Sequence, residues 1–338
     1  MNGELGNYLP GIGLDIGTAF ICVARKLRNG DVEFLSQRDA FLELEPVSAL
    51  NAKMIQKSLD AKGAFYLNKE GKFFIVGQHA VEVANERGQN VDRPLKQGIL
   101  SARDRESFGM LSKIIEILVK PAIINKEKCY YTYPADPIDE SFDAIYHQKV
   151  VGSILENLGY NAVPVLESEA LAYSELLDEG LTGVAMSWGA GQTNICAMHM
   201  GSNVLSFSVA RGGDWIDHKV SEQLGHSDTI IQAEKEAGFS LLEPHGDIQK
   251  ALTIYYDHLM NYVASSIESN INKATTLPNF REPIKIILSG GTSLPDGFAE
   301  KFKQIILMKN FNITIGSIEK ASDPLTAVSN GCLIASQL

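Results

Sequence analysis

The stretch Gly11-Ile-Gly-Leu-Asp-Ile-Gly-Thr-Ala19, which leads directly into Phe20-Ile-Cys-Val-Ala-Arg-Lys-Leu27, decides the fold. Both runs are rich in apolar residues and are separated by a glycine and a threonine, so the pattern predicts strand, turn, strand. A similar unit recurs about half a chain later: Val184-Ala-Met-Ser-Trp188, the bend Gly189-Ala-Gly-Gln-Thr193, and a strand over 194–200. An internal repeat of this kind predicts two lobes of similar construction.

A third glycine-rich bend lies near the end of the chain. Pro283-Ile-Lys-Ile-Ile-Leu288 predicts a buried strand, and Ser289-Gly-Gly-Thr292 follows it. Helical periodicity over 167–177 and 250–274 alternates with the strands, and Asp136 followed by Pro137 predicts the start of a further helix. This alternation predicts an α/β fold in which helices flank a mixed β-sheet in each lobe.

The composition excludes several classes of protein. The 338 residues suffice for about two domains, and 41 acidic against 30 basic residues give a net charge of −11, so we expect no nucleic-acid partner. We find no signal peptide, no membrane anchor and no uninterrupted apolar run of about 20 residues, and therefore expect a cytoplasmic protein. The four scattered cysteines form no CxxC pair, and the histidines have no metal-ligand spacing.

The three glycine bends suggest a phosphate site. Glycine lets a ligand approach the backbone closely, and several converging backbone amides form a nest that binds anions. Asp15, which lies beside the first bend, cannot bind phosphate directly, but it can hold Mg²⁺ through water. A Walker-type site is excluded because the chain has no GxxxxGK[ST] motif, and the absence of GxGxxG after the first strand disfavours a dinucleotide-binding unit.

Further motifs accompany these bends in a regular order. Arg93-Pro-Leu-Lys-Gln-Gly-Ile99 and Thr132-Tyr-Pro-Ala135 precede the second unit, Glu167-Ser-Glu-Ala-Leu-Ala-Tyr173 leads into it, and Gly212-Gly-Asp-Trp-Ile-Asp217 follows it. With Asp323-Pro-Leu-Thr-Ala-Val-Ser-Asn-Gly331, the series spans nearly the whole chain. It resembles the actin/Hsp70/sugar-kinase ATPase superfamily, and the chain is most similar to bacterial MreB-type actin-like proteins.

The resemblance implies that ATP or ADP binds with Mg²⁺ in a cleft between the two lobes. Asp15 would hold the hydrated metal ion, and Glu167 would position the attacking water. The residues implied at the phosphates are Gly17, Thr18, Ser187, Gly189, Gly191, Gln192 and Thr193. The resemblance further places Gly212, Gly213 and Asp214 near the ribose and phosphates. It places Glu234 and Lys235 of an "AEK" segment at the ribose and base, and Gly290 and Gly291 against the adenosine.

Structural interpretations of several residues stay open beside these roles. Glu167 could serve only as a first-turn acid that favours the helix dipole, and Glu234 with Lys235 could be a solvated pair on a helix. Trp188 fits a core residue better than a stacking ligand contact. Asp217 could serve only to start its helix.

The chain departs from the family pattern at the phosphates. The second phosphate loop usually opens with Asp, but this chain has Ser187, which brings no negative charge to Mg²⁺. The usual polar residue after Gly-Thr-Ala is Phe20 here. We therefore expect slow hydrolysis but unimpaired nucleotide binding.

The same resemblance divides the chain and indicates its role. We expect a first lobe at 8–160 with a small subdomain at about 38–92, and a second lobe at 161–338 with a reduced small subdomain at about 217–255. The expected function is that of an ATP-binding actin-like protein that assembles head to tail into filaments. The alternative is a non-polymerising, Hsp70-like nucleotide-binding scaffold with an unknown protein partner, and a small-molecule kinase ranks third.

Overall fold

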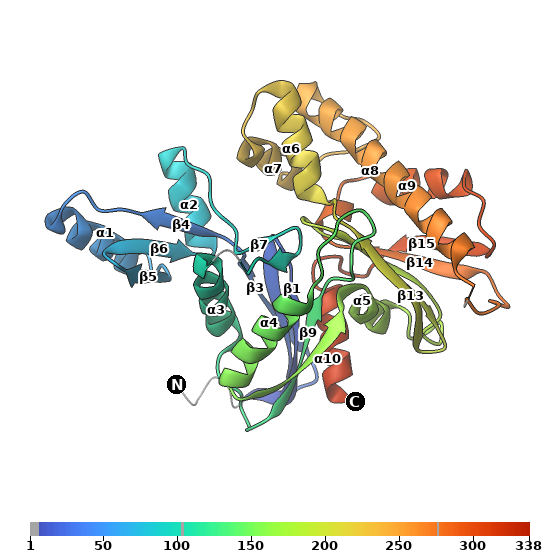
Figure 1. Ribbon diagram of the computed structural model, residues 1–338, viewed down its shortest axis with the longest axis horizontal. Coiled ribbons are helices and arrows are strands. Elements are labelled where there is room, and N and C mark those ends of the chain that lie inside the picture. The colour runs from blue at the N-terminus through green and yellow to red at the C-terminus, as the bar shows by residue number, and fades with distance from the viewer. Residues whose placement is uncertain (1–6, 103–104, 276) are drawn as a thin grey trace.

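Two five-stranded mixed sheets form the centres of the two lobes (Figure 1). The computed structural model describes residues 7–102, 105–275 and 277–338. The first sheet has the order β10 (Tyr160–Leu166), β9 (Glu127–Tyr133), β1 (Tyr8–Ile16), β2 (Phe20–Leu27) and β3 (Val32–Arg38). The second has the order β15 (Ile315–Lys320), β14 (Ile284–Ser289), β11 (Gly183–Trp188), β12 (Thr193–His199) and β13 (Ser202–Val209).

The two sheets have the same topology, which confirms the internal repeat. In the first sheet β1 and β2, and β2 and β3, pair antiparallel, whereas β1 pairs parallel with β9 and β9 with β10. In the second sheet β11, β12 and β13 form the antiparallel meander, and β14 and β15 are the parallel strands. The predicted α/β class with a mixed sheet in each lobe is therefore confirmed.

Each lobe carries additional elements beyond its sheet. Between β3 and β7 the chain forms a small three-stranded sheet with two helices: β4 (Phe41–Leu44), α1 (Ala49–Ala61), β5 (Tyr66–Lys69), β6 (Lys72–Val76) and α2 (Gln78–Arg87). A short hairpin and two helices complete the first lobe: β7 (Leu95–Lys96), β8 (Ile99–Leu100), α3 (Arg105–Val119) and α4 (Ile145–Asn157). After β13 come α6 (Gly213–Leu224), α7 (Asp228–Glu236), α8 (Gly246–Lys273) and α9 (Phe298–Leu307).

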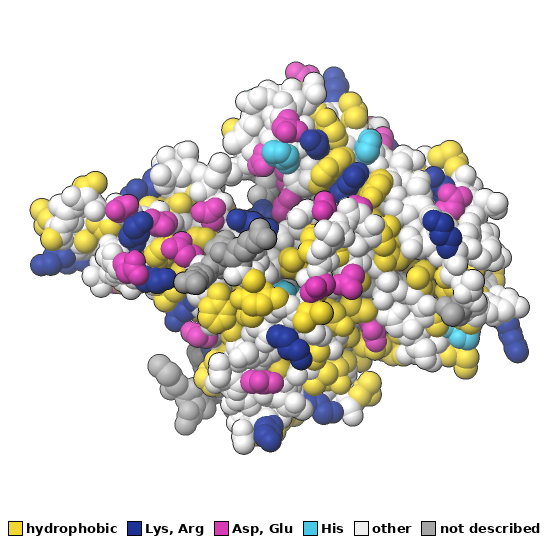
Figure 2. All heavy atoms as spheres, viewed as in Figure 1, with side chains coloured by type: hydrophobic (Ala, Val, Ile, Leu, Met, Phe, Trp, Pro, Cys, Tyr) yellow, Lys and Arg dark blue, Asp and Glu magenta, His cyan; other side chains and the backbone are white. Residues whose placement is uncertain are grey.

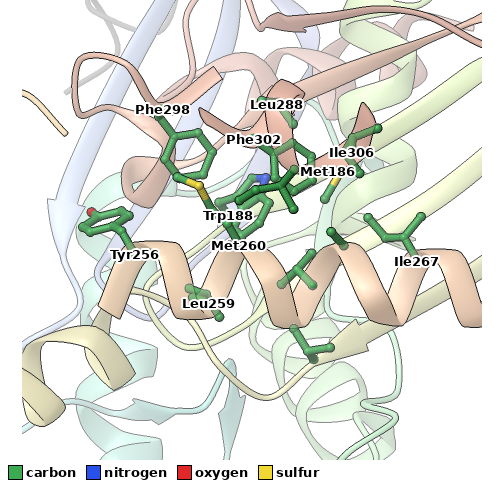
Figure 3. Packing of buried hydrophobic residues seen from close by; sticks show 14 of the residues in the cluster. Met186, Trp188, Tyr256, Leu259, Met260, Ile267, Leu288, Phe298, Phe302 and Ile306 are labelled. Carbon is green, nitrogen blue, oxygen red and sulfur yellow. The ribbon is translucent and has the colours of Figure 1, made fainter. Parts of the chain in front are cut away.

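The core of the second lobe lies between its sheet and the long helix α8. Trp188, at the end of β11, is fully buried, and its ring meets Phe298 and Phe302 of α9 edge to face at centroid distances of 5.1 Å each. Met260 and Leu259 of α8 pack on the same cluster (Figure 3). Trp188 is thus a core residue, the interpretation that the sequence favoured.

One predicted helix start is wrong. Asp136 does not begin a helix, because α4 starts only at Ile145. The carbonyl of Asp136 accepts a hydrogen bond from the Ser208 amide (3.1 Å), and the Ile138 amide donates to the Ser208 carbonyl (2.9 Å). The segment therefore extends along β13 of the other lobe, and this long-range pairing replaces the helical turn that the local sequence favours.

Two helices cross from one lobe to the other. α5 (Glu167–Glu175) follows the first sheet but packs on β11 and β12, whereas α10 (Ala327–Gln337), at the end of the chain, packs on β1 and β9. They also pack on each other, and the contact is backbone to backbone. A Cβ atom added at Gly331 of α10 would lie 1.7 Å from the carbonyl oxygen of Ala170 in α5. A Cβ added at Gly13 of β1 would lie 2.2 Å from the Leu333 amide of α10.

No helix in the described part of the chain is long and apolar enough to cross a membrane.

Replacing Gly331 should test this contact. Gly331→Ala should lower the free energy of unfolding by at least about 2 kcal/mol, because the methyl group overlaps the α5 backbone and the two helices must separate. Gly109→Ala is the matched control. Gly109 also lies within a helix, but its Cβ would meet nothing within 4 Å, so alanine should stabilise the protein by up to about 1 kcal/mol. Chemical denaturation of the three proteins measures both changes, and equal stabilisation by the two alanines would contradict the close contact.

Candidate functional site

The three glycine bends meet in one cleft, which has a volume of about 660 Å³ and is lined by residues of both lobes. Most of the predicted site residues line it: Asp15, Gly17, Thr18, Glu167, Ser187, Gly189, Gly191, Gln192, Asp214, Lys235, Gly290 and Gly291. The predicted site residues that do not line it are Thr193, Gly212, Gly213 and Glu234. The structure therefore gathers in one place side chains that are far apart in the sequence.

Two carboxylates face the floor of the cleft. Asp15, near the end of β1, accepts a hydrogen bond from the Thr132 hydroxyl (2.9 Å). Glu167 is the first residue of α5, and its two oxygens accept bonds from the Ser187 hydroxyl (2.5 Å) and the Asn194 side-chain amide (2.9 Å). Ser187, which replaces the acid expected at this position, thus donates to Glu167 instead of offering a charge of its own.

The environment disfavours the ionised form of both carboxylates. Burial raises the pKa of Asp15 above its ordinary value, and the Thr132 hydrogen bond only partly offsets this. Burial raises the pKa of Glu167 as well, and the nearby charge of Asp15 raises it further. A divalent cation would supply the positive charge that favours the ionised forms, so the donor set fits Mg²⁺ held directly or through water.

Two glycines at the start of α6, Gly212 and Gly213, allow this helix to approach the second glycine bend closely. The Gly213 amide donates to the Gly189 carbonyl (3.0 Å), and a Cβ added at Gly212 would lie 2.4 Å from the same oxygen. Thr193 is buried, and its hydroxyl donates to the Arg211 carbonyl (3.0 Å). Thr193, Gly212 and Gly213 therefore support the residues that line the cleft without lining it themselves. Their direct contact with phosphate stays a prediction.

The β7–β8 hairpin joins the first two bends across the lobes. The Gly98 amide donates to the Thr18 hydroxyl (3.0 Å), and the Gln192 side-chain amide donates to the Gln97 carbonyl (2.5 Å). A Cβ added at Gly191 would lie 2.5 Å from the Thr18 hydroxyl and 2.6 Å from the Gly98 amide nitrogen, so the position requires glycine. Gly98 also lines the cleft. The sequence pattern identifies 93–99 as a motif but does not place Gly98 in the site.

The end of the cleft beside the third bend is apolar. Leu294 and Leu325 are 46% and 54% exposed, and both line the cleft with Phe239 and Pro295. A Cβ added at Gly291 would lie 3.9 Å from Leu325, so the leucine covers this glycine. A planar base fits such a slot. Sequence reasoning missed these residues because apolar side chains beside a bend look like ordinary core residues.

The acid and the lysine of the "AEK" segment point in different directions. Glu234 accepts a hydrogen bond from Gln249 of α8 (2.9 Å) and so faces away from the cleft. Lys235 lines the cleft and donates to Asp217 (2.7 Å) and to the Gly213 carbonyl (3.2 Å). The two residues are thus not a freely solvated pair, and Asp217, rather than Glu234, is the acid beside Lys235.

Two arginines of the first lobe reach across to the second. Arg93 donates to both oxygens of Asp214 at the start of α6 (2.7 Å each), and Arg38, at the end of β3, donates to Glu236 at the end of α7 (2.8 and 2.5 Å). The Arg38 guanidinium also lies 4.2 Å from the ring centre of Phe20, which lines the cleft. Figure 2 shows the surface hollowed between the small three-stranded sheet and the α6–α7 region, with basic and acidic side chains at the rim. We call these two ion pairs the clasp.

A protein-family model described as Volactin matches residues 11–336. The chain belongs to the Volactin family. A search of curated proteins found no match. Solved structures of MamK and MreB5 resemble the chain, so the predicted similarity to MreB-type actin-like proteins is confirmed at the level of the fold.

Three solved structures illustrate the likeness. A structure described as a MamK double helical filament has a TM-score of 0.70 and 17% sequence identity, over 97% of this chain and 98% of that one. MreB5 of Spiroplasma citri bound to ADP has a TM-score of 0.64 and 17% identity, over 95% and 94%. The ethanolamine utilization protein EutJ from Carboxydothermus hydrogenoformans has a TM-score of 0.56 and 13% identity, over 97% and 90%.

The raised pKa values predict a pH-dependent effect of removing one carboxylate. Below the pKa of about 4.5 that Glu167 has in the unfolded chain, Glu167 is protonated in both the folded and the unfolded protein. Its burial then does not affect the free energy of unfolding. As the pH rises towards the folded-state pKa, the unfolded state loses its proton first and the protein loses stability. Glu167→Gln should therefore stabilise the metal-free protein by at least about 1 kcal/mol at pH 8, and this gain should vanish at pH 4.

Thermal unfolding at the two pH values measures the effect. Glu156→Gln, an exposed position on α4, is the control and should change stability equally at both. A gain from Glu167→Gln that is the same at pH 4 and pH 8 would contradict the raised pKa.

Proposed function

We propose that this chain binds ATP or ADP with Mg²⁺ in the interlobe cleft, assembles head to tail with copies of itself, and hydrolyses ATP slowly. The observation that carries the proposal is the convergence of three glycine bends and two carboxylates on one cleft. Glycine bends suit phosphates, the apolar slot suits a base, and the carboxylates suit a divalent cation. The MamK and MreB5 structures show that the same fold occurs in a filament and with bound ADP.

The residues of the cleft would divide the work of hydrolysis. Mg²⁺, when bound, neutralises charge on the phosphates. Asp15 would orient the waters of the metal ion from the end of β1. Glu167 would accept a hydrogen bond from the attacking water, and its raised pKa suits a group that takes up a proton near neutral pH. The Ser187 hydroxyl donates to one Glu167 oxygen and would help to orient this carboxylate.

Head-to-tail assembly would follow from a contact that does not close on itself, which produces a filament. The serine at position 187, where the actin-like pattern usually has an aspartate, favours a second candidate, a nucleotide-binding scaffold that does not polymerise. Slow hydrolysis would keep such a scaffold in its ATP-bound state for a long time. The two candidates share the same cleft and differ only in self-association.

Nucleotide binding and assembly can be tested together. Mg-ATP and Mg-ADP should raise the free energy of unfolding by about 2.7 kcal/mol at a concentration about 100 times Kd, since the ligand binds only the folded state. Ultracentrifugal pelleting and electron microscopy with Mg-ATP should then show filaments. An unchanged melting temperature with both nucleotides would overturn the proposal. Nucleotide binding without assembly at any salt or protein concentration would support the non-polymerising scaffold instead.

The role of Ser187 gives a further prediction. Ser187→Asp places a third carboxylate beside Asp15 and Glu167, so the variant should depend more strongly on Mg²⁺ and release phosphate about tenfold faster. Ser187→Ala is the control, since it removes the hydroxyl without adding charge and should not accelerate the reaction. Phosphate release from the purified proteins decides the matter. A wild-type rate equal to that of Ser187→Asp would show that the serine does not limit hydrolysis.

A further inference from the structure

Asp217 is a buried acid in the wall of the cleft that the proposed function does not use. It lies one turn into α6, its side chain is 4% exposed, and it is among the residues that line the cleft. One oxygen accepts a hydrogen bond from Lys235 (2.7 Å), and the same ammonium group also donates to the Gly213 carbonyl (3.2 Å). The lysine therefore fixes the orientation of the carboxylate.

The second oxygen of this carboxylate is unsatisfied. Oδ1 of Asp217 is buried and has no hydrogen-bond partner among the residues that the structure describes. Buried polar atoms in folded proteins almost always have a partner, because leaving one without costs its desolvation. An acceptor of this kind in a cleft wall is a site for a donor that arrives with a ligand.

The position of Asp217 indicates which part of a nucleotide would meet it. Gly213, bonded to the same lysine, contacts Gly189 of the second bend, on the phosphate side. Tyr256 of α8 is also close to Asp217: burial raises the pKa of Tyr256, and the charge of Asp217 raises it further. The Tyr256 ring lies 5.9 Å from that of Phe239, which lines the apolar part of the cleft. Asp217 thus lies between the phosphate bend and the slot for the base, where a bound nucleotide has its ribose.

The chemistry of the ribose matches this acceptor. A carboxylate repels phosphate oxygens, whereas the 2′ and 3′ hydroxyl groups can each donate a hydrogen bond to it. Glu234, one of two acids that the resemblance placed near the ribose, accepts a hydrogen bond from Gln249 and does not line the cleft. Asp214 also lines the cleft, but both of its oxygens accept hydrogen bonds from Arg93, whereas one oxygen of Asp217 has no partner among the described residues.

We propose that Asp217, oriented by Lys235, accepts a hydrogen bond from the ribose hydroxyls and makes the cleft selective for ribonucleotides over deoxyribonucleotides. The inference rests on the proposed function, because it requires that the cleft binds a nucleotide. It assigns a role in ligand specificity to Asp217, for which the sequence alone offered only the start of a helix as an alternative role.

If Oδ1 of Asp217 has a purely structural role, it should not affect nucleotide selectivity. The Tyr256 hydroxyl also lacks a partner among the described residues, and Figure 3 shows it at one end of the aromatic cluster, pointing away from the other labelled side chains. A buried water that joins this hydroxyl to Asp217 would satisfy both atoms without any ligand. In that case neither residue would affect the choice between ribose and deoxyribose.

Titration calorimetry with ATP, 2′-deoxy-ATP and 3′-deoxy-ATP, each with Mg²⁺, tests the proposal. The wild type should bind ATP about tenfold more tightly than at least one deoxy form, the size expected for a hydrogen bond to a charged group. Asp217→Asn and Asp217→Ala should weaken ATP binding towards that of the deoxy forms and change the deoxy affinities less. Tyr256→Phe should keep the preference.

The control is Asp257→Asn, which removes another ion-paired aspartate, bonded to Lys301 on α9 and not among the residues that line the cleft. It should leave all three affinities unchanged. Equal affinity of the wild type for the three nucleotides would overturn the proposed ribose contact but not the proposed nucleotide binding. This comparison uses the wild type alone and needs no variant. Full discrimination in both Asp217 variants would also overturn it. Failure of every nucleotide to bind would overturn the proposed function and this inference together.

Discussion

The backbone contacts of α10 with β1 and α5 are the constraint on which the rest of the structure depends. At Gly13 and Gly331 the main chains approach so closely that a single methyl group cannot be accommodated without a shift. Asp15 lies two residues after Gly13 on the same strand, and Glu167 lies one helical turn before Ala170, which Gly331 contacts. The packing that joins the lobes therefore also sets the relative positions of the two carboxylates at the cleft floor.

The chemistry of the cleft floor reflects a balance between stability and charge. Two buried carboxylates already have raised pKa values, and a third at position 187 would increase their repulsion in the absence of metal. The serine avoids this cost, because its hydroxyl donates to Glu167 and stabilises the ionised form. The same hydroxyl brings no negative charge to a cation. Under the proposed function, the same serine would therefore stabilise the metal-free protein and bind Mg²⁺ less tightly than an aspartate would.

The open side of the cleft is held by contacts of a different kind. The clasp joins the lobes through Arg93–Asp214 and Arg38–Glu236, and the acidic partners of both pairs are more than a third exposed. Ion pairs in such positions contribute modestly, of the order of 1 kcal/mol or less each, and weaken as salt increases. Close backbone packing therefore holds the floor of the cleft, and weaker ion pairs join the lobes at its rim.

The sequence by itself determined the elements whose signal is local. Apolar strands separated by glycine bends, and their repetition in the second half, predicted the two sheets, and the motifs along the chain predicted most of the residues that meet in the cleft. These features are visible because strand alternation, glycine bends and helix caps depend on residues a few positions apart. Gly88, for example, ends α2 in the left-handed conformation that favours glycine.

Only the tertiary structure decided which side chains meet across the lobes. Asp136 has the local pattern of a helix start, yet its backbone pairs with Ser208, far along the chain. Glu234 and Asp217 are both acids near the second bend, but only the packing of α6, α7 and α8 turns Asp217 to the cleft and Glu234 to Gln249. Arg38 and Glu236 are separated by 198 positions. Such contacts depend on how packed helices and sheets orient each side chain, and no local pattern encodes that orientation.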